Sequence, residues 1–183
     1  DSSRQETIER MIIEAVHHIE DLCNQRHWEQ ARTEAERLVR LFPRHEQVQG
    51  VTDVIDRKRD EYKAELLRGY HEAFGRNESE RCVRILKELD PYLTSSEAEA
   101  LAESARGVFR SQLHNLGVQF SLAVAEKRWR DALETGLRIT GGFPNSRMAQ
   151  EVREKMEVLR KRAGYSTDAV ADVIEQRAHG SAR

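Results

Sequence analysis

Apolar side chains recur at helical spacing along nearly the whole chain, and this pattern constrains the fold more than any other feature. Between residues 4 and 24, for example, Ile8, Ile12, Ala15 and Ile19 follow one another at steps of three or four, as on the buried face of an amphipathic helix. Prolines and glycines then divide the pattern into segments. The sequence predicts helices over residues 4–24, 28–42, 45–74, 78–90, 96–126, 129–140 and 145–163.

The composition agrees with an all-α fold. Of the 183 residues, 34% are charged and 38% are hydrophobic, which is typical of helices with one buried stripe and wide solvated faces. Three prolines and ten glycines are too few for the many turns of a β-sandwich or barrel. Short connections between successive helices favour antiparallel neighbours.

Two stretches of the chain resemble each other. Residues 26–45 and 127–146 both contain Trp, then Ala three residues later, then Phe-Pro, and each matched residue lies 101 positions on. A weaker copy lies midway, with Ser79 and Cys82 in the places of Trp28 and Ala31. The sequence therefore predicts three helix–turn–helix units with a period near 50. The units cover about 4–43, 45–94 and 96–144, and residues 145–163 close a single domain that spans 1–164.

The matched residues suggest structural roles. Ala31, Cys82 and Ala132 are small enough to let two helices approach closely, and Trp28 and Trp129 are expected to close the ends of helix pairs. Pro43 and Pro144 are each expected to start the following helix. Ser95 or Ser96 is the expected N-cap of the helix over 96–126, and Asn145 or Ser146 that of the last helix.

The third unit resembles a tetratricopeptide repeat. The first helix of that family is matched by Leu116, Gly117 and Phe120, and the second by Trp129, Ala132 and Pro144. The resemblance covers residues 11–163, as a divergent array with lengthened helices. The resemblance implies a solenoid of stacked helix pairs that binds a protein or peptide on the faces of the first helices. The residues that this mapping assigns to the partner surface are Arg10, Ile13, His17, Glu20, Asp21, Glu61, Ala64, Arg68, His71, Glu72, Ser111, His114, Val118, Ser121 and Leu122.

No motif predicts catalysis or a cofactor. Glu14-x-x-His17 has the spacing of a di-iron helix but lacks the second such motif and the partner glutamates. The pair Cys23 and His27 is too small a set of ligands for zinc. Ser111 and His114 lack the strained turn and the third group of a nucleophilic site. We therefore expect a protein that is not an enzyme and that needs neither a metal nor a cofactor.

Charge and hydropathy limit the partners. The formal net charge is −2, with acids and bases mixed along the chain, so we expect no nucleic-acid binding. Of the 30 basic residues 24 are arginine, which is typical of a GC-rich genome and favours a bacterial source. No apolar run is long enough to span a membrane. Free cysteines at buried helix positions favour the cytoplasm. A chain without an initiator Met is expected to be a piece of a longer protein, and the alternative location is the soluble part of a membrane-anchored protein.

The sequence predicts that residues 165–183 form a short capping helix, a docking segment for a neighbour or partner, or a flexible tail. Val170, Val173 and Ile174 lie on one face of a helix that Ser166 or Thr167 would cap, and such a helix would cover the exposed stripe of the last unit. Together these features predict a non-catalytic helical scaffold for protein–protein interaction. The alternative is a structural role, as a self-assembling protein or a subunit of a membrane-anchored complex.

Overall fold

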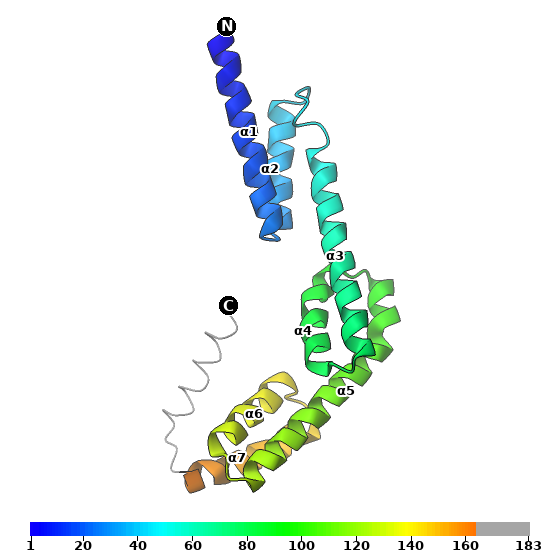
Figure 1. Cartoon of the computed structure of the whole chain (residues 1–183), viewed down its shortest axis with the longest axis vertical. Coiled ribbons are helices and arrows are strands. Elements are labelled where there is room, and N and C mark those ends of the chain that lie inside the picture. The colour runs from blue at the N-terminus through cyan, green and yellow to red at the C-terminus, as the bar shows by residue number, and fades with distance from the viewer. Residues whose placement is uncertain (164–183) are drawn as a thin grey trace. The chain divides into compact units, whose positions relative to one another are not determined.

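The computed structural model describes residues 1–163, and these residues are all-helical, as the sequence predicts (Figure 1). Within them there is no strand. The predicted helix or tail over 165–183 lies outside the described residues. The elements are α1 (Ser2–Asn24), α2 (Trp28–Leu41), α3 (Val51–Gly75), α4 (Ser79–Leu89), the 3-10 turn η1 (Asp90–Tyr92), α5 (Ser95–Ala125), α6 (Trp129–Gly142) and α7 (Arg147–Ala163).

Most helix boundaries fall within two or three residues of those predicted, but α3 begins six residues late. Residues 45–50 form successive turns, and Gly50 adopts a φ of +79°, which glycine tolerates without steric cost. Pro43 therefore does not start α3, and that prediction was wrong. The sequence misled because Val48 is buried beside Val51 and Ile55, so tertiary packing in a turn continued the apolar spacing of a helix.

The N-caps confirm one prediction and correct another. Ser146 caps α7, since its Oγ accepts a hydrogen bond from the Ala149 N–H at 3.0 Å. The N-cap of α5 is Thr94, whereas Ser95 and Ser96 lie inside the helix. Thr94 Oγ1 accepts from the Glu97 N–H at 3.3 Å, and Glu97 Oε1 accepts from the Thr94 N–H at 2.9 Å, which makes a complete capping box.

Three of the connections between helices are alike. Residues 25–27, 76–78 and 126–128 each join two helices, and in each the middle residue is left-handed: Arg26 at φ 63°, Asn77 at φ 57° and Lys127 at φ 57°. In the first and third turns the N–H groups return to the preceding helix by two hydrogen bonds, as in a Schellman motif. The bonds are Arg26 N–H to Cys23 O, His27 N–H to Leu22 O, Lys127 N–H to Val124 O and Arg128 N–H to Ala123 O.

The two Trp…Phe-Pro stretches also have matching backbones. The residue after α2 is Phe42 at φ −134° and ψ 61°, and the residue after α6 is Phe143 at φ −135° and ψ 57°. After each of them the N–H three residues on bonds back to the phenylalanine carbonyl, at 3.2 Å for His45 and 3.1 Å for Ser146. From that residue onward the two backbones differ, because Ser146 caps a helix directly whereas His45 is followed by further turns. Matching sequence therefore corresponds to matching local structure.

The chain divides into two compact units, which we describe separately. The first comprises Asp1–Gly75 and Ile85–Leu93. Helices α1, α2 and α3 pack on one another there, and Ala31 at the crossing is fully buried. The core of this unit consists of Ile12, Ile19, Leu22, Cys23, Ala31, Ala35, Leu38, Val48, Val51 and Ile55.

Aromatic residues tie the start of α2 to α3 and η1 within the first unit. Trp28 Nε1 donates a hydrogen bond to the Tyr92 hydroxyl at 2.7 Å, and the Tyr62 ring lies 5.5 Å from that of Tyr92 and 6.2 Å from that of Trp28, between centroids. The Tyr62 hydroxyl donates to Glu88. Burial and this hydrogen bond raise the pKa of Tyr62 to about 12. Trp28 therefore binds to later elements of the chain as well as to its own helix pair.

The second unit comprises Arg76–Arg84 and the residues from Thr94 onward. Helices α5 and α7 both pack on α6. Its core consists of Leu116, Phe120, Ala123, Ala132, Leu133, Ile139, Ala149, Val152, Met156 and Leu159. Arg138 on α6 also forms an ion pair with Glu80 at the start of α4, with 2.7 Å between Nη2 and Oε1.

Candidate functional site

The residues that the tetratricopeptide resemblance assigns to the partner surface are solvent-exposed, on α1, α3 and α5. Those on α1 and α3 belong to the first unit and those on α5 to the second. On α1, Arg10 and Ile13 border a shallow hollow, and His17 Nδ1 lies 3.6 Å from Glu20 Oε2. On α3, Glu61 pairs with Arg57 at 3.9 Å. These are surface contacts between neighbouring turns of one helix, and such pairs are worth little energetically.

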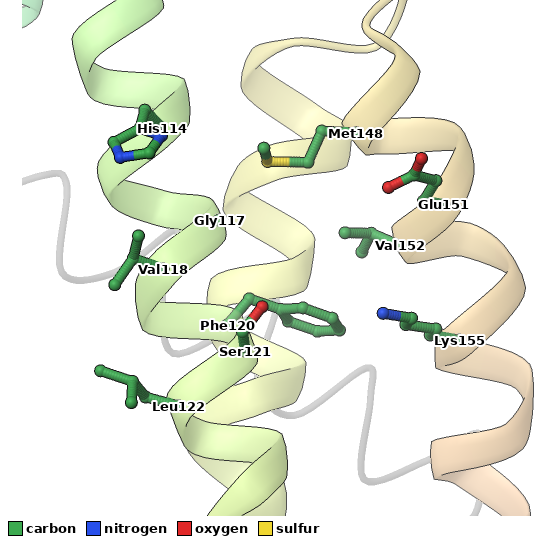
Figure 2. Close-up of a pocket in the computed structure, with 10 residues that line it drawn as sticks. All are labelled: His114, Gly117, Val118, Phe120, Ser121, Leu122, Met148, Glu151, Val152 and Lys155. Atoms are coloured by element: carbon green, nitrogen blue, oxygen red, sulfur yellow. The ribbon is translucent and has the colours of Figure 1, made fainter.

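A cavity of about 370 Å³ lies between α5 and α7 in the second unit (Figure 2). We call it the α5–α7 groove. The resemblance assigned four of its residues to the partner surface, namely His114, Val118, Ser121 and Leu122. The full lining is His114, Gly117, Val118, Phe120, Ser121, Leu122, Met148, Glu151, Val152 and Lys155.

The groove has an apolar base and exposed apolar edges. Phe120 and Val152 are buried and form part of its floor, whereas Val118 is 46% exposed and Leu122 is 51% exposed. Figure 2 shows Met148, Val152 and Lys155 pointing from α7 toward α5. On the same side of α7, one turn beyond Lys155, Val158 is 49% exposed. Exposed aliphatic side chains beside a cavity are the usual mark of a site that another chain covers.

Two glycines set the spacing of the helices around the groove. A Cβ on Gly117 would lie 2.6 Å from both Sδ and Cε of Met148, so the missing side chain lets Met148 rest against α5. On α6, a Cβ on Gly136 would meet Met156, Phe120 and Val152 at 3.1 to 3.2 Å. The groove is therefore held by a close three-helix contact behind it, while Met148, with a flexible side chain, forms one end.

Charged side chains border the groove. Glu151 pairs with Arg147 at 3.6 Å on the solvent side of α7. Lys155 forms no ion pair with any described residue, and its position at the cavity leaves a cation available to a ligand. His114 lies on the α5 side. The site thus combines a central apolar surface with an acid, a base and an imidazole at its margin.

Sequence reasoning missed the α7 half of this site. Met148, Glu151, Val152 and Lys155 line the groove, yet residues 145–163 were assigned only a closing role. The available signal was the resemblance itself, because a helix that follows a complete unit occupies the place of the next first helix. The second signal was Gly117, which lies within a predicted helix, since a glycine at such a position often marks the close approach of another element.

Among residues 1–163 there is no group of three or more His, Cys, Asp or Glu that could hold a metal ion. Burial raises the pKa of the Cys23 and Cys82 thiols, which disfavours the nucleophilic thiolate. Within the same range, no helix is both long enough and apolar enough to cross a membrane.

Comparison with known proteins gives no family to carry over. No family model matches the chain, and searches of curated proteins and of solved structures also give no match.

Proposed function

We propose that the protein is a non-catalytic helical scaffold that binds a segment of another protein in the α5–α7 groove. The observation that carries this proposal is that exposed Val118 and Leu122 border an apolar cavity at the positions that the tetratricopeptide resemblance assigns to partner binding.

The dimensions and chemistry of the groove suit side chains of a helix better than a small polar metabolite. A cavity of about 370 Å³ is at the small end of ligand sites, and it is open along two helices. An amphipathic helix that docks in such a groove inserts apolar residues spaced by three or four. The charges of Glu151 and Lys155 would then contact polar residues at the margins of that helix.

Selection from a phage-displayed library of amphipathic helical peptides tests this proposal. Peptides that bind the full chain should bind the Val118→Glu variant at least about tenfold more weakly, because the new carboxylate would be desolvated in the complex. Leu41→Glu is the matched control, since Leu41 is 61% exposed on α2, outside the groove. Equal binding to the wild type and to Val118→Glu, or an equal loss in the control, would refute the assignment.

A second candidate function, self-assembly, is favoured by α1. Every residue from Ser2 to Met11 is exposed, including Ile8 and Met11. An isolated helical segment of this length is marginal in water, so a covering partner would stabilise it. A second copy of the chain is the partner that this alternative names.

Light scattering over a range of concentrations tests self-assembly. A mass that rises with concentration for the wild type, and that falls to the monomer value in Met11→Glu, would support it. A monomer mass at every concentration would exclude it.

A further inference from the structure

We propose that residues 166–177 of this chain, which lie outside the described residues, occupy the α5–α7 groove and so compete with an external partner. The competition with an external partner rests on the proposed function. The binding of the segment in the groove does not depend on that function and can be tested separately.

The sequence of the segment has the chemistry that the groove accepts. Val170, Val173 and Ile174 follow at i, i+3 and i+4, and Arg177 continues the same helical face. The opposite face carries Asp168, Asp172 and Glu175. A helix with this pattern would place its aliphatic residues against Leu122 and Val158 and would keep its acids in solvent.

The connection to α7 allows the segment to reach the groove. From Lys155, which lines the groove, α7 continues to Ala163, roughly 12 Å at 1.5 Å per residue. Residues 164–169 can span roughly 20 Å when extended. The chain can therefore turn back after α7 and run antiparallel to it.

Charge and spacing also match in that orientation. Val158 and Glu151 on α7 are two helical turns apart, and so are Val170 and Arg177 in the segment. An antiparallel helix that brings Val170 to Val158 therefore brings Arg177 to Glu151. Glu151 has only the exposed Arg147 as an ion-pair partner among the described residues, so its carboxylate can accept a second cation.

The covalent tether makes this occupant effective. A short linker gives the attached segment an effective concentration on the order of 1 mM, so even weak intrinsic affinity would keep the groove occupied. An external helix would bind only after it displaced the segment. Access to the groove would then depend on anything that draws residues 166–177 away.

Disulfide trapping in the full chain tests the proposal. In the variant Leu122→Cys with Ile174→Cys, mild oxidation should form an intramolecular disulfide about tenfold faster than in the control Gln150→Cys with Ile174→Cys. Gln150 is exposed on α7, and it lies two residues from both Met148 and Val152, which places it on the opposite face of that helix from the groove. The native Cys23 and Cys82 are buried, and burial raises their pKa, so both should remain reduced.

A charge exchange gives a second measurement. Arg177→Glu should slow the trapping reaction, and Glu151→Arg added to it should restore the rate. The proposal is overturned if the Gln150 pair forms its disulfide as fast as the Leu122 pair, or if only intermolecular disulfides form. The latter result would identify a second copy as the occupant.

The peptide selection and the trapping experiment fail independently. Rapid trapping, with no peptide selected either on the wild type or on the Ile174→Glu variant whose segment is weakened, would refute the proposed function and leave the intramolecular contact. Peptides that bind the groove, with no preferential trapping, would support the proposed function and refute the intramolecular contact. If both hold, Ile174→Glu should bind the selected peptides more tightly than the wild type does.

Discussion

At the scale of single residues, one glycine controls a close contact of three helices in the second unit. A methyl group on Gly136 would press on Met156, Phe120 and Val152 at once, and Phe120 and Val152 are almost fully buried. Overpacking of this kind costs about 1–3 kcal/mol, which exceeds the gain of about 1 kcal/mol from replacing glycine by alanine in a helix.

We therefore expect Gly136→Ala to lower the free energy of unfolding, as measured by urea denaturation. Gly107→Ala on α5 is the matched control, because a Cβ there meets no atom within 4 Å. This control should be stabilised by up to about 1 kcal/mol. A stabilised Gly136→Ala protein would show that α6 is not held as tightly as the contacts indicate.

The Tyr62 hydroxyl makes stability depend on pH in the alkaline range. Its native pKa of about 12 lies above the ordinary value of 10, so the native state holds the phenol proton more tightly than the unfolded chain does. The resulting stabilisation is complete below pH 10 and is lost as the pH rises from 10 to 12.

An alkaline titration followed by tyrosinate absorbance checks this expectation. Tyr62→Phe should remove a phenol that ionises at about pH 12 and should leave the earlier ionisations unchanged. If the variant instead loses a phenol that ionises near the ordinary value, Tyr62 is not buried against Glu88.

At the scale of the helices, the sequence predicted the type and order of the elements well, but it predicted some helix ends poorly. The spacing of Ile12 and Ile19, or of Leu116 and Phe120, is set by burial on one helix face and can be recognised without the fold. The start of α3 was misplaced because Val48 is buried from a turn, and spacing alone does not separate the two cases. The N-cap of α5 was misplaced by one residue because three consecutive residues, Thr94 to Ser96, all have capping side chains.

The capping box at Thr94 gives a prediction at this scale. Thr94→Ala removes the acceptor for the Glu97 N–H and should lower the free energy of unfolding by about 1 kcal/mol. Ser95→Ala lies one residue inside the helix and should change it by less than about 0.5 kcal/mol. Thermal unfolding followed by circular dichroism distinguishes them, and a larger loss in Ser95→Ala than in Thr94→Ala would assign the cap to Ser95.

At the scale of the whole molecule, the α5 side of the candidate groove could be predicted from the sequence and the α7 side could not. His114 and Val118 followed from the resemblance, because positions on a first helix map one by one. Met148 and Lys155 did not, because they line the groove only through the way that α7 packs beside α5. Contacts between helices depend on crossings such as those at Gly117 and Gly136, which a one-dimensional pattern does not specify.

The unequal lengths of the connections have a consequence for protease resistance. A protease must draw several residues of chain into its active site, and three-residue turns such as 126–128, held by hydrogen bonds to the preceding helix, do not supply them. Residues 42–50 are the longest connection between helices in the described part of the chain, and Arg44 is exposed within it. Among the connections between helices, brief trypsin treatment should therefore cut first after Arg44, separating α1 and α2 from the remainder, whereas an earlier cut after Arg26 or Lys127 would contradict this.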